Sequence, residues 1–127
     1  MRDVDLLVRA AFLYPMSDGL PIVADGEVAV VAGRIVHAGP RQPEGTWRAR
    51  RVIGGSRFAA LPGFVNCHCH TASIIFRSQT DDHAARSALF DVAFRMEKDV
   101  AEEEWATCAE VGVADMLRAG ITTINDI

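Results

Sequence analysis

The sequence predicts an α/β fold in which a small β unit precedes a strand, a helical region and a second strand. Three observations lead to this prediction. Short apolar and β-branched runs, separated by Gly and Pro turns, occupy residues 1–60. An apolar run then passes directly into Asn66-Cys67-His68-Cys69-His70. Apolar residues at three- and four-residue spacing lead from there to a β-branched run at residues 120–127. We therefore expect two domains, over residues 1–60 and 61–127.

The first domain has the pattern of short strands joined by turns. Two of its apolar runs flank Ala32-Gly33, which predicts a β-hairpin. Residues 39–45 are rich in Pro and Gly and are expected to form a loop. The expected strands are residues 4–10, 27–31, 34–38, 50–53 and 57–60.

The second domain has the pattern of a βα unit. Its clearest helix is predicted to start with a capping box formed by Asp99 and Glu102 and to end at Arg118, with Gly120 just beyond. The strands before and after the helical region are expected to be parallel. The expected elements are a strand ending at His70, a short helix or turn at residues 74–77, helices at 84–97 and 99–118, and a strand at 120–127.

The composition argues against several classes of function. Half of the residues are apolar, and the formal charge of -4 comes without a basic stripe, which argues against a nucleic-acid surface. The sequence has neither an apolar run of membrane-spanning length nor a signal-peptide pattern at its start, so we expect a cytoplasmic protein. Its three cysteines provide no disulfide framework. Because the sequence stops inside a β-branched run, we expect it to be a fragment.

The segment 66–70 carries the strongest chemical signal. Side chains alternate between the faces of a strand, so His68 and His70 point the same way with Cα atoms about 6.5 to 7 Å apart. Two imidazoles in this arrangement can bind one metal ion. Cys67 and Cys69 face the other way, which disfavours a structural zinc cluster of all four side chains, although an irregular backbone would permit one. The remaining alternative is a buried structural strand without a metal.

Four further residues are candidates for the site. Arg77 binds substrate or forms a surface salt bridge. His83 lies in an expected loop and contacts either substrate or solvent. Asp126 ends the second strand, where its carboxylate either supports the metal site indirectly or accepts a hydrogen bond from a loop. Asn66 lies on the same face as the histidines and is expected to support the site through a structural hydrogen bond.

These motifs together resemble a known family. The segment 61–70 follows a β unit that contains Gly33-Arg34-Ile35-Val36, and it precedes Phe76-Arg77 and Gly120-Ile121-Thr122-Thr123. This combination resembles the amidohydrolase superfamily. Asn66 and Phe76-Arg77 make it most similar to the branch of aminohydrolases and chlorohydrolases, which includes S-adenosylhomocysteine/methylthioadenosine deaminases, guanine deaminases and triazine hydrolases.

The resemblance implies a fold and a metal. The fold is a β-sandwich, to which residues 1–60 contribute, and a (β/α)8 TIM-type barrel, which begins with residues 61–127. His68 and His70 bind one divalent ion, zinc or alternatively iron, and later barrel strands supply two further histidines and an aspartate. Such a barrel takes roughly 250 residues, so the chain contains about a quarter of its strands.

The resemblance also implies a reaction, the hydrolysis of a non-peptide C–N bond. Water activated by the metal attacks a ring carbon of a small heterocyclic substrate, such as a purine or triazine, and the ring is deaminated. The full-length protein is expected to be a homo-oligomer without nucleic-acid or membrane partners, and the 127-residue chain alone is expected to be inactive. Two alternatives remain open. One is a non-catalytic metal-binding or oligomer-forming protein; the other is a superfamily member that opens a cyclic amide or removes chloride.

Overall fold

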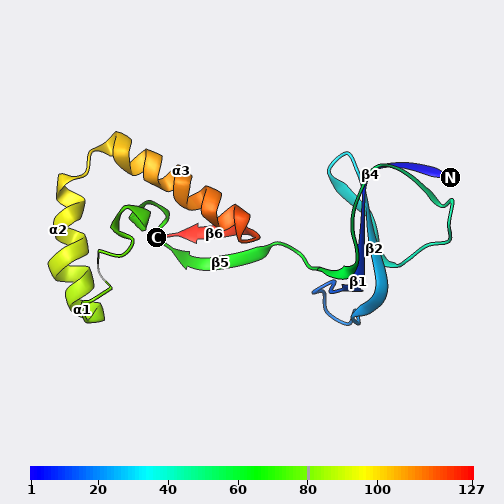
Figure 1. Cartoon of the computed structure of the whole chain (residues 1–127), viewed down its shortest axis with the longest axis horizontal. Coiled ribbons are helices and arrows are strands. Elements are labelled where there is room, and N and C mark those ends of the chain that lie inside the picture. The colour runs from blue at the N-terminus through cyan, green and yellow to red at the C-terminus, as the bar shows by residue number, and fades with distance from the viewer. Residues whose placement is uncertain (80) are drawn as a thin grey trace. The chain divides into compact units, whose positions relative to one another are not determined.

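A computed structural model describes residues 1–79 and 81–127. The chain divides into two compact units, Met1–Pro62 and Gly63–Ile127 (Figure 1). The first unit contains a four-stranded sheet, and the second contains two paired strands together with the helices. The expected α/β class is confirmed at this level.

The first unit is a mixed sheet with strand order β3-β2-β1-β4. Strand β1 is antiparallel to β2 and parallel to β4. The predicted hairpin is confirmed, since β2 and β3 pair antiparallel on either side of Ala32-Gly33. The strands are β1 (Arg2–Leu13), β2 (Val23–Val31), β3 (Arg34–Pro40) and β4 (Trp47–Ala60).

One prediction within this sheet is wrong. Residues 50–53 and 57–60 were expected to be separate strands, but both belong to β4, because β1 pairs with the chain on both sides of Gly54-Gly55. The register between the two strands shifts just after Gly55. A bulge absorbs extra residues without ending a strand, so a pair of glycines does not by itself mark a strand end.

The core of the first unit includes a buried carboxylate. Leu7 and Ala29 are almost fully buried, and Glu27 is only 2% exposed. Its Oε1 accepts hydrogen bonds from the backbone N–H of Gln42 at 2.9 Å and from the indole N–H of Trp47 at 2.7 Å. These bonds compensate for the removal of the carboxylate from water and attach the segment after β3 to the sheet.

The second unit is built on two parallel strands, β5 and β6, whose predicted parallel pairing is confirmed. The predicted helix at residues 84–97 is confirmed as a helical segment from residue 85 onward, but it is not α-helical throughout, because a π-helical turn, η2, lies between α1 and α2. Three- and four-residue spacing does not reveal such a turn. The elements are β5 (Phe64–Cys69), η1 (Thr71–Phe76), α1 (Ala85–Ser87), η2 (Ala88–Ala93), α2 (Phe94–Met96), η3 (Glu97–Asp99), α3 (Glu102–Arg118) and β6 (Ile121–Asp126).

The start of α3 differs from the prediction. Asp99 ends η3, and the extended residue Val100 separates it from α3, so the predicted capping box of Asp99 with Glu102 is wrong. Instead, the carboxylate of Glu104 accepts a hydrogen bond from the backbone N–H of Ala101 at 2.9 Å. Consecutive acidic residues crowd this segment, so the sequence does not show which of them occupies the third helical position.

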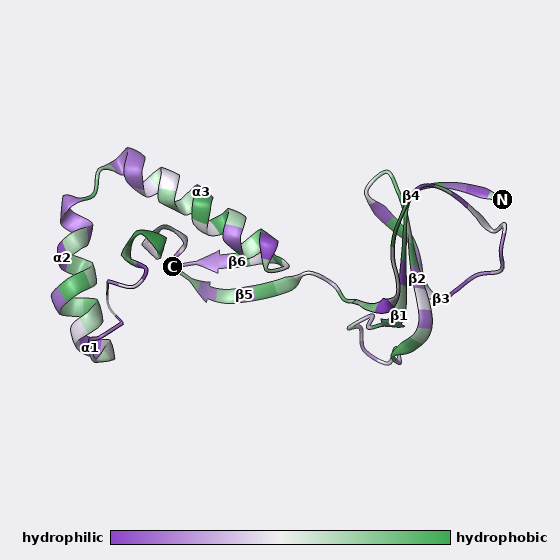
Figure 2. Ribbon diagram, in the orientation of Figure 1, coloured by the Kyte–Doolittle hydropathy of each residue, from purple (hydrophilic) through white to green (hydrophobic). Residues whose placement is uncertain are grey.

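The end of α3 agrees with the prediction, with Arg118 as its last residue and Gly120 just beyond. Figure 2 shows that polar and apolar residues both occur along the whole of α3. Within residues 1–79 and 81–127, no helix is long and apolar enough to cross a membrane.

Candidate functional site

The two histidines of the predicted metal pair lie side by side at the end of β5. His68 belongs to the strand, and His70 directly follows its last residue, Cys69. The two ring centroids are 5.2 Å apart, and the ring planes are inclined at 85°. Both histidines are exposed, whereas Cys69 is buried and its Sγ lies 3.5 Å from the carbonyl oxygen of Asn125. The imidazoles are therefore accessible to a ligand, and the Cys69 thiol is not.

The histidines are the metal-binding groups that the chain offers at this place. Among residues 1–79 and 81–127, no three His, Cys, Asp or Glu side chains are placed to hold one metal ion together. Burial raises the pKa of the Cys69 thiol, and the nearby Asp126 carboxylate raises it further. Since zinc binds the thiolate, the raised pKa disfavours Cys69 as a ligand.

The ring of His70 is held through one of its nitrogens. Its Nδ1 lies 2.6 Å from the carbonyl oxygen of Ile127. A carbonyl oxygen only accepts, so Nδ1 donates its proton there and Nε2 presents its lone pair elsewhere. Such a bond to the second ring nitrogen is the usual way to orient a metal-binding histidine. Asn66 makes a hydrogen bond within β5, with its side-chain Oδ1 accepting from the backbone N–H of His68 at 3.2 Å.

Asp126, at the end of β6, contacts the segment that follows β5. Its carboxylate accepts hydrogen bonds from the backbone N–H of Thr71 at 3.0 Å and from the Thr71 hydroxyl. The bond from the hydroxyl is the main reason that the pKa of Asp126 is lowered, and the bond from the amide adds to it. Of the two predicted roles of Asp126, the hydrogen bond to the next segment is therefore the one formed directly. The Asp126 carboxylate is hydrogen-bonded to Thr71, the residue that directly follows His70 in the chain.

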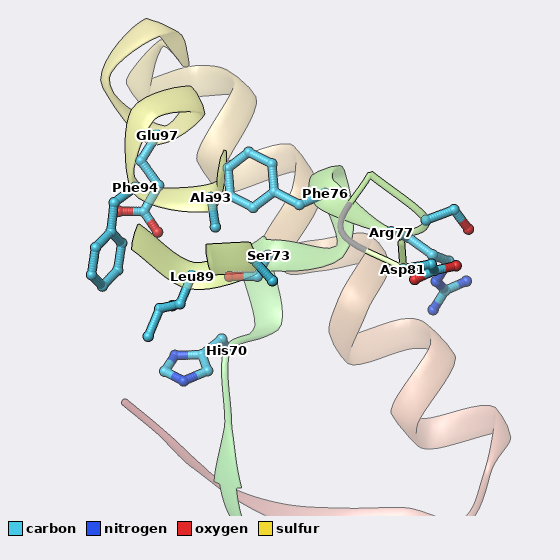
Figure 3. A pocket seen from close by; sticks show the side chains of 11 residues that line it. His70, Ser73, Phe76, Arg77, Asp81, Leu89, Ala93, Phe94 and Glu97 are labelled. Atoms are coloured by element: carbon cyan, nitrogen blue, oxygen red, sulfur yellow. The ribbon is translucent and has the colours of Figure 1, made fainter. Parts of the chain in front are cut away.

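A pocket of about 580 Å³ lies beside His70 (Figure 3). One wall comes from η1 and the other from the helical segment 85–99. Apolar atoms provide most of the lining surface, although six of its eleven residues are polar or charged. Apolar surface combined with polar groups that can orient a ligand is the usual character of a small-molecule site. The lining residues include His70, Ser73, Phe76, Arg77, Leu89, Phe94 and Glu97.

Glu97 is one of the charged pocket residues that are missing from the candidates predicted from the sequence. It also lines a second hollow of about 420 Å³ together with His70 and Asp126. A signal for it exists, because Leu89, Ala93 and Glu97 recur every four residues, so a helix places the carboxylate on the same face as the apolar side chains. An acidic residue on such a face indicates a polar contact to a neighbour or a ligand.

Comparison with protein-family models identifies the family to which the second unit is related. A family model described as the amidohydrolase family matches residues 59–127. The chain belongs to the amidohydrolase family. The matched region contains the histidine pair, Asp126 and the pocket, so every element of the candidate site lies in the part of the chain that the amidohydrolase model covers.

The individual amidohydrolases to which the chain is similar include two deaminases and a chlorohydrolase. The 5-methylthioadenosine/S-adenosylhomocysteine deaminase of Pelotomaculum thermopropionicum is 33% identical over 97% of this chain and 29% of its own length. The crystal structure of an adenosine deaminase from Xanthomonas campestris with bound zinc has a TM-score of 0.87 and 28% identity, covering 98% of this chain and 29% of that one. Atrazine chlorohydrolase from Arthrobacter aurescens TC1, complexed with zinc, shares the fold with a TM-score of 0.78 at 22% identity, covering 95% of this chain and 28% of that one.

The two deaminases confirm the predicted resemblance to the aminohydrolase branch, and the chlorohydrolase structure shows that the chain shares its fold. The chain spans only 29% of the length of the Pelotomaculum deaminase and 29% of the length of the Xanthomonas structure.

The two residues of this amidohydrolase chain that were expected to bind substrate differ in their placement. Arg77 lines the pocket, but its guanidinium also forms an ion pair with Asp115 at 3.0 Å, the alternative that the sequence left open. His83 is exposed and is not part of the described pocket lining. The structure brings Asp81, not His83, to the pocket, because the turn at residues 81–83 presents its first residue there.

Proposed function

We propose that the chain is the N-terminal part of a metal-dependent hydrolase that cleaves a non-peptide C–N bond, by hydrolytic deamination of a purine, triazine or related ring. The observation that carries the proposal is the exposed pair of imidazoles, His68 and His70, at the end of a parallel strand and beside a pocket. Active sites of parallel α/β barrels lie at this end of the strands. On this proposal the first unit contributes to a β-sandwich, and the second begins a (β/α)8 barrel.

The two histidines fit a zinc ion. Two imidazoles bound to one tetrahedral ion at about 2.0–2.1 Å have ring centres roughly 5 Å apart. The ring centroids of His68 and His70 are 5.2 Å apart. The hydrogen bond from Nδ1 of His70 to the Ile127 carbonyl leaves Nε2 as the nitrogen that would hold the ion. When bound, such an ion supplies the Lewis acidity that makes water a nucleophile near neutral pH.

The pocket beside His70 supplies the binding surface for the ring. Phe76, Leu89 and Phe94 offer apolar surface against which a flat heterocycle can pack. Glu97 offers a carboxylate that accepts hydrogen bonds from amino or hydroxyl groups of the substrate. Arg77 donates hydrogen bonds from the same lining once its ion pair with Asp115 opens. These groups orient the substrate with its reacting carbon toward the histidine pair.

The test uses the complete gene product, in which His68 and His70 are replaced by alanine singly and together. The expected result is loss of zinc, measured by elemental analysis, with loss of ammonia release from a panel of purine nucleosides and aminotriazines. His37→Ala is the matched control, because the ring of His37 bonds to the Pro40 carbonyl in the first unit. Unchanged zinc content in the double variant would move the metal site elsewhere and overturn the assignment. Zinc-dependent release of chloride instead of ammonia would retain the site and change the leaving group.

A further inference from the structure

Thr71, the residue directly after His70, is held far more tightly than a residue at a strand end needs to be. It is 3% exposed although both of its chain neighbours are more exposed. Its backbone N–H and its hydroxyl both donate to the Asp126 carboxylate at the end of β6. A single carboxylate thus fixes both the main chain and the side chain of Thr71.

The helix α3 holds Thr71 from a second direction. A Cβ atom added to Gly112 would lie 2.2 Å from the Thr71 carbonyl oxygen, so the backbone of α3 packs directly against the backbone of Thr71. Glycine is required there because any side chain would occupy the space of the carbonyl. Further along η1, the rings of Phe76 and Trp105 meet edge to face with centroids 5.7 Å apart, which holds η1 on the same helix.

The backbone of His70 has fewer anchors, since its carbonyl oxygen accepts one hydrogen bond, from the backbone N–H of Ser73 at 3.1 Å. Strand β5 ends at Cys69, and the last paired residues of the two strands are Cys69 and Asp126. His70 is therefore the first residue beyond the pairing with β6, and its direction depends on what holds the next residue. A binding group must be held within about 0.5 Å of its productive position to work well.

We propose that Thr71 is a positioning residue, which Asp126 and Gly112 hold in place so that His70 leaves β5 in the direction needed to bind the metal. This inference rests on the proposed function, because it assigns a purpose to the placement of a proposed metal ligand. We call Thr71, Asp126 and Gly112 the Thr71 clamp. The hydrogen bonds of Asp126 act on the site through the Thr71 backbone and side chain.

Single substitutions can remove the hydrogen bonds of the Thr71 clamp one at a time. Thr71→Ser keeps both donors, whereas Thr71→Val keeps the shape and the amide but removes the hydroxyl. Asp126→Asn keeps the size but replaces one acceptor oxygen with an amino group, which cannot accept from a second Thr71 donor. Asp3→Asn is the matched control, since it is the same substitution at an exposed ion pair with Arg48 in the other unit.

The experiment measures zinc affinity and backbone protection in the complete gene product. Competition with a chromogenic chelator is expected to show that Thr71→Val and Asp126→Asn weaken zinc binding about 10- to 100-fold, the usual effect of losing an indirect supporting contact. Thr71→Ser and Asp3→Asn are expected to bind zinc as the unmodified protein does. The double variant Thr71→Val/Asp126→Asn is expected to lose no more affinity than the weaker-binding single variant, because the two residues act through one contact.

A second readout works on the zinc-free protein. Hydrogen exchange of the Thr71 amide is expected to be slow in the unmodified protein and at least about tenfold faster in Asp126→Asn, because the carboxylate that protects it is altered. Unmodified zinc affinity in folded Thr71→Val and Asp126→Asn would overturn the proposal, as would an unprotected Thr71 amide. If instead the histidine variants keep their zinc, the proposed function fails, and the exchange of the Thr71 amide still decides whether the clamp exists.

Discussion

Replacing Gly112 with alanine tests the close approach of α3 to Thr71. In an exposed helix interior, Gly→Ala stabilises by about 1 kcal/mol because alanine has the higher helix propensity. Here the added Cβ would lie 2.2 Å from the Thr71 carbonyl oxygen and 3.0 Å from its carbonyl carbon. Ordinary contacts between carbon and oxygen are about 3.3–3.6 Å long, so the two backbones must separate by roughly 1 Å.

The expected cost follows from these distances. Overpacking a well-packed site costs about 1–3 kcal/mol, and the upper end applies because the opposing atoms are backbone and cannot rotate away. After subtraction of the propensity gain of about 1 kcal/mol, α3 should lose about 2 kcal/mol of local stability. This corresponds to a roughly 30-fold larger equilibrium constant for opening of the helix.

Native-state hydrogen exchange of the α3 amides measures this opening free energy directly. Ala114→Gly is the matched control, because Ala114 is exposed two residues further along the same helix and should lose about 1 kcal/mol from propensity alone. Zinc affinity should fall in Gly112→Ala and not in Ala114→Gly. If Gly112→Ala makes α3 more stable, by the amount that propensity predicts, the close packing against Thr71 is refuted.

Three other predictions concern the first unit and the pocket. Leu7→Ala should destabilise the first unit by about 2–5 kcal/mol, since the Leu7 side chain is 2% exposed. Ile35→Ala should lose little stability, since Ile35 is 66% exposed, and thermal melts of the two variants measure the difference. The hydrogen bond from Arg48 is the main cause of the lowered pKa of Asp3, so the contribution of this pair is present above pH 3.8 and is lost as the pH falls through the lower pKa of the folded state. The stability difference between the protein and Asp3→Asn should therefore shrink in acid, and an unchanged difference at pH 2 would contradict this. If the proposed deamination is correct, Glu97→Gln should raise KM for the amino-substituted ring about 10-fold or more with zinc content unchanged, because a hydrogen bond to a charged group contributes about 1.5–3 kcal/mol.

The sequence predicts those parts of the structure that local patterns determine. The hairpin around Ala32-Gly33 and the end of α3 at Arg118 follow from short-range signals. The parallel pairing of β5 with β6 follows from the general rule that strands joined through a helical crossover run parallel. The nearness of the His68 and His70 rings also agrees with alternation along a strand, although His70 itself lies just beyond the end of β5.

The parts that the sequence does not predict depend on partners far away in the chain. Strand β4 runs through Gly54-Gly55 because β1 pairs with it on both sides, and no local signal reveals that partner. No sequence signal distinguishes Thr71 from any other threonine near a strand end. Its contacts with Asp126 and Gly112 form only in the folded chain. Glu97 is likewise recognised as part of a pocket only once η1 forms the opposite wall.

The buried carboxylate of Glu27 limits where the first unit can tolerate change. The segment after β3 has the Pro- and Gly-rich composition of a loop that accepts insertions freely. Its two ends are nevertheless attached to one oxygen atom, through the amide of Gln42 and the indole of Trp47. Additional residues can therefore enter only between these two points, at residues 43–46, where they lengthen the loop without moving either donor. An insertion before Gln42 would leave a buried charge with half of its hydrogen bonds, a cost that a loop elsewhere on the surface would not carry.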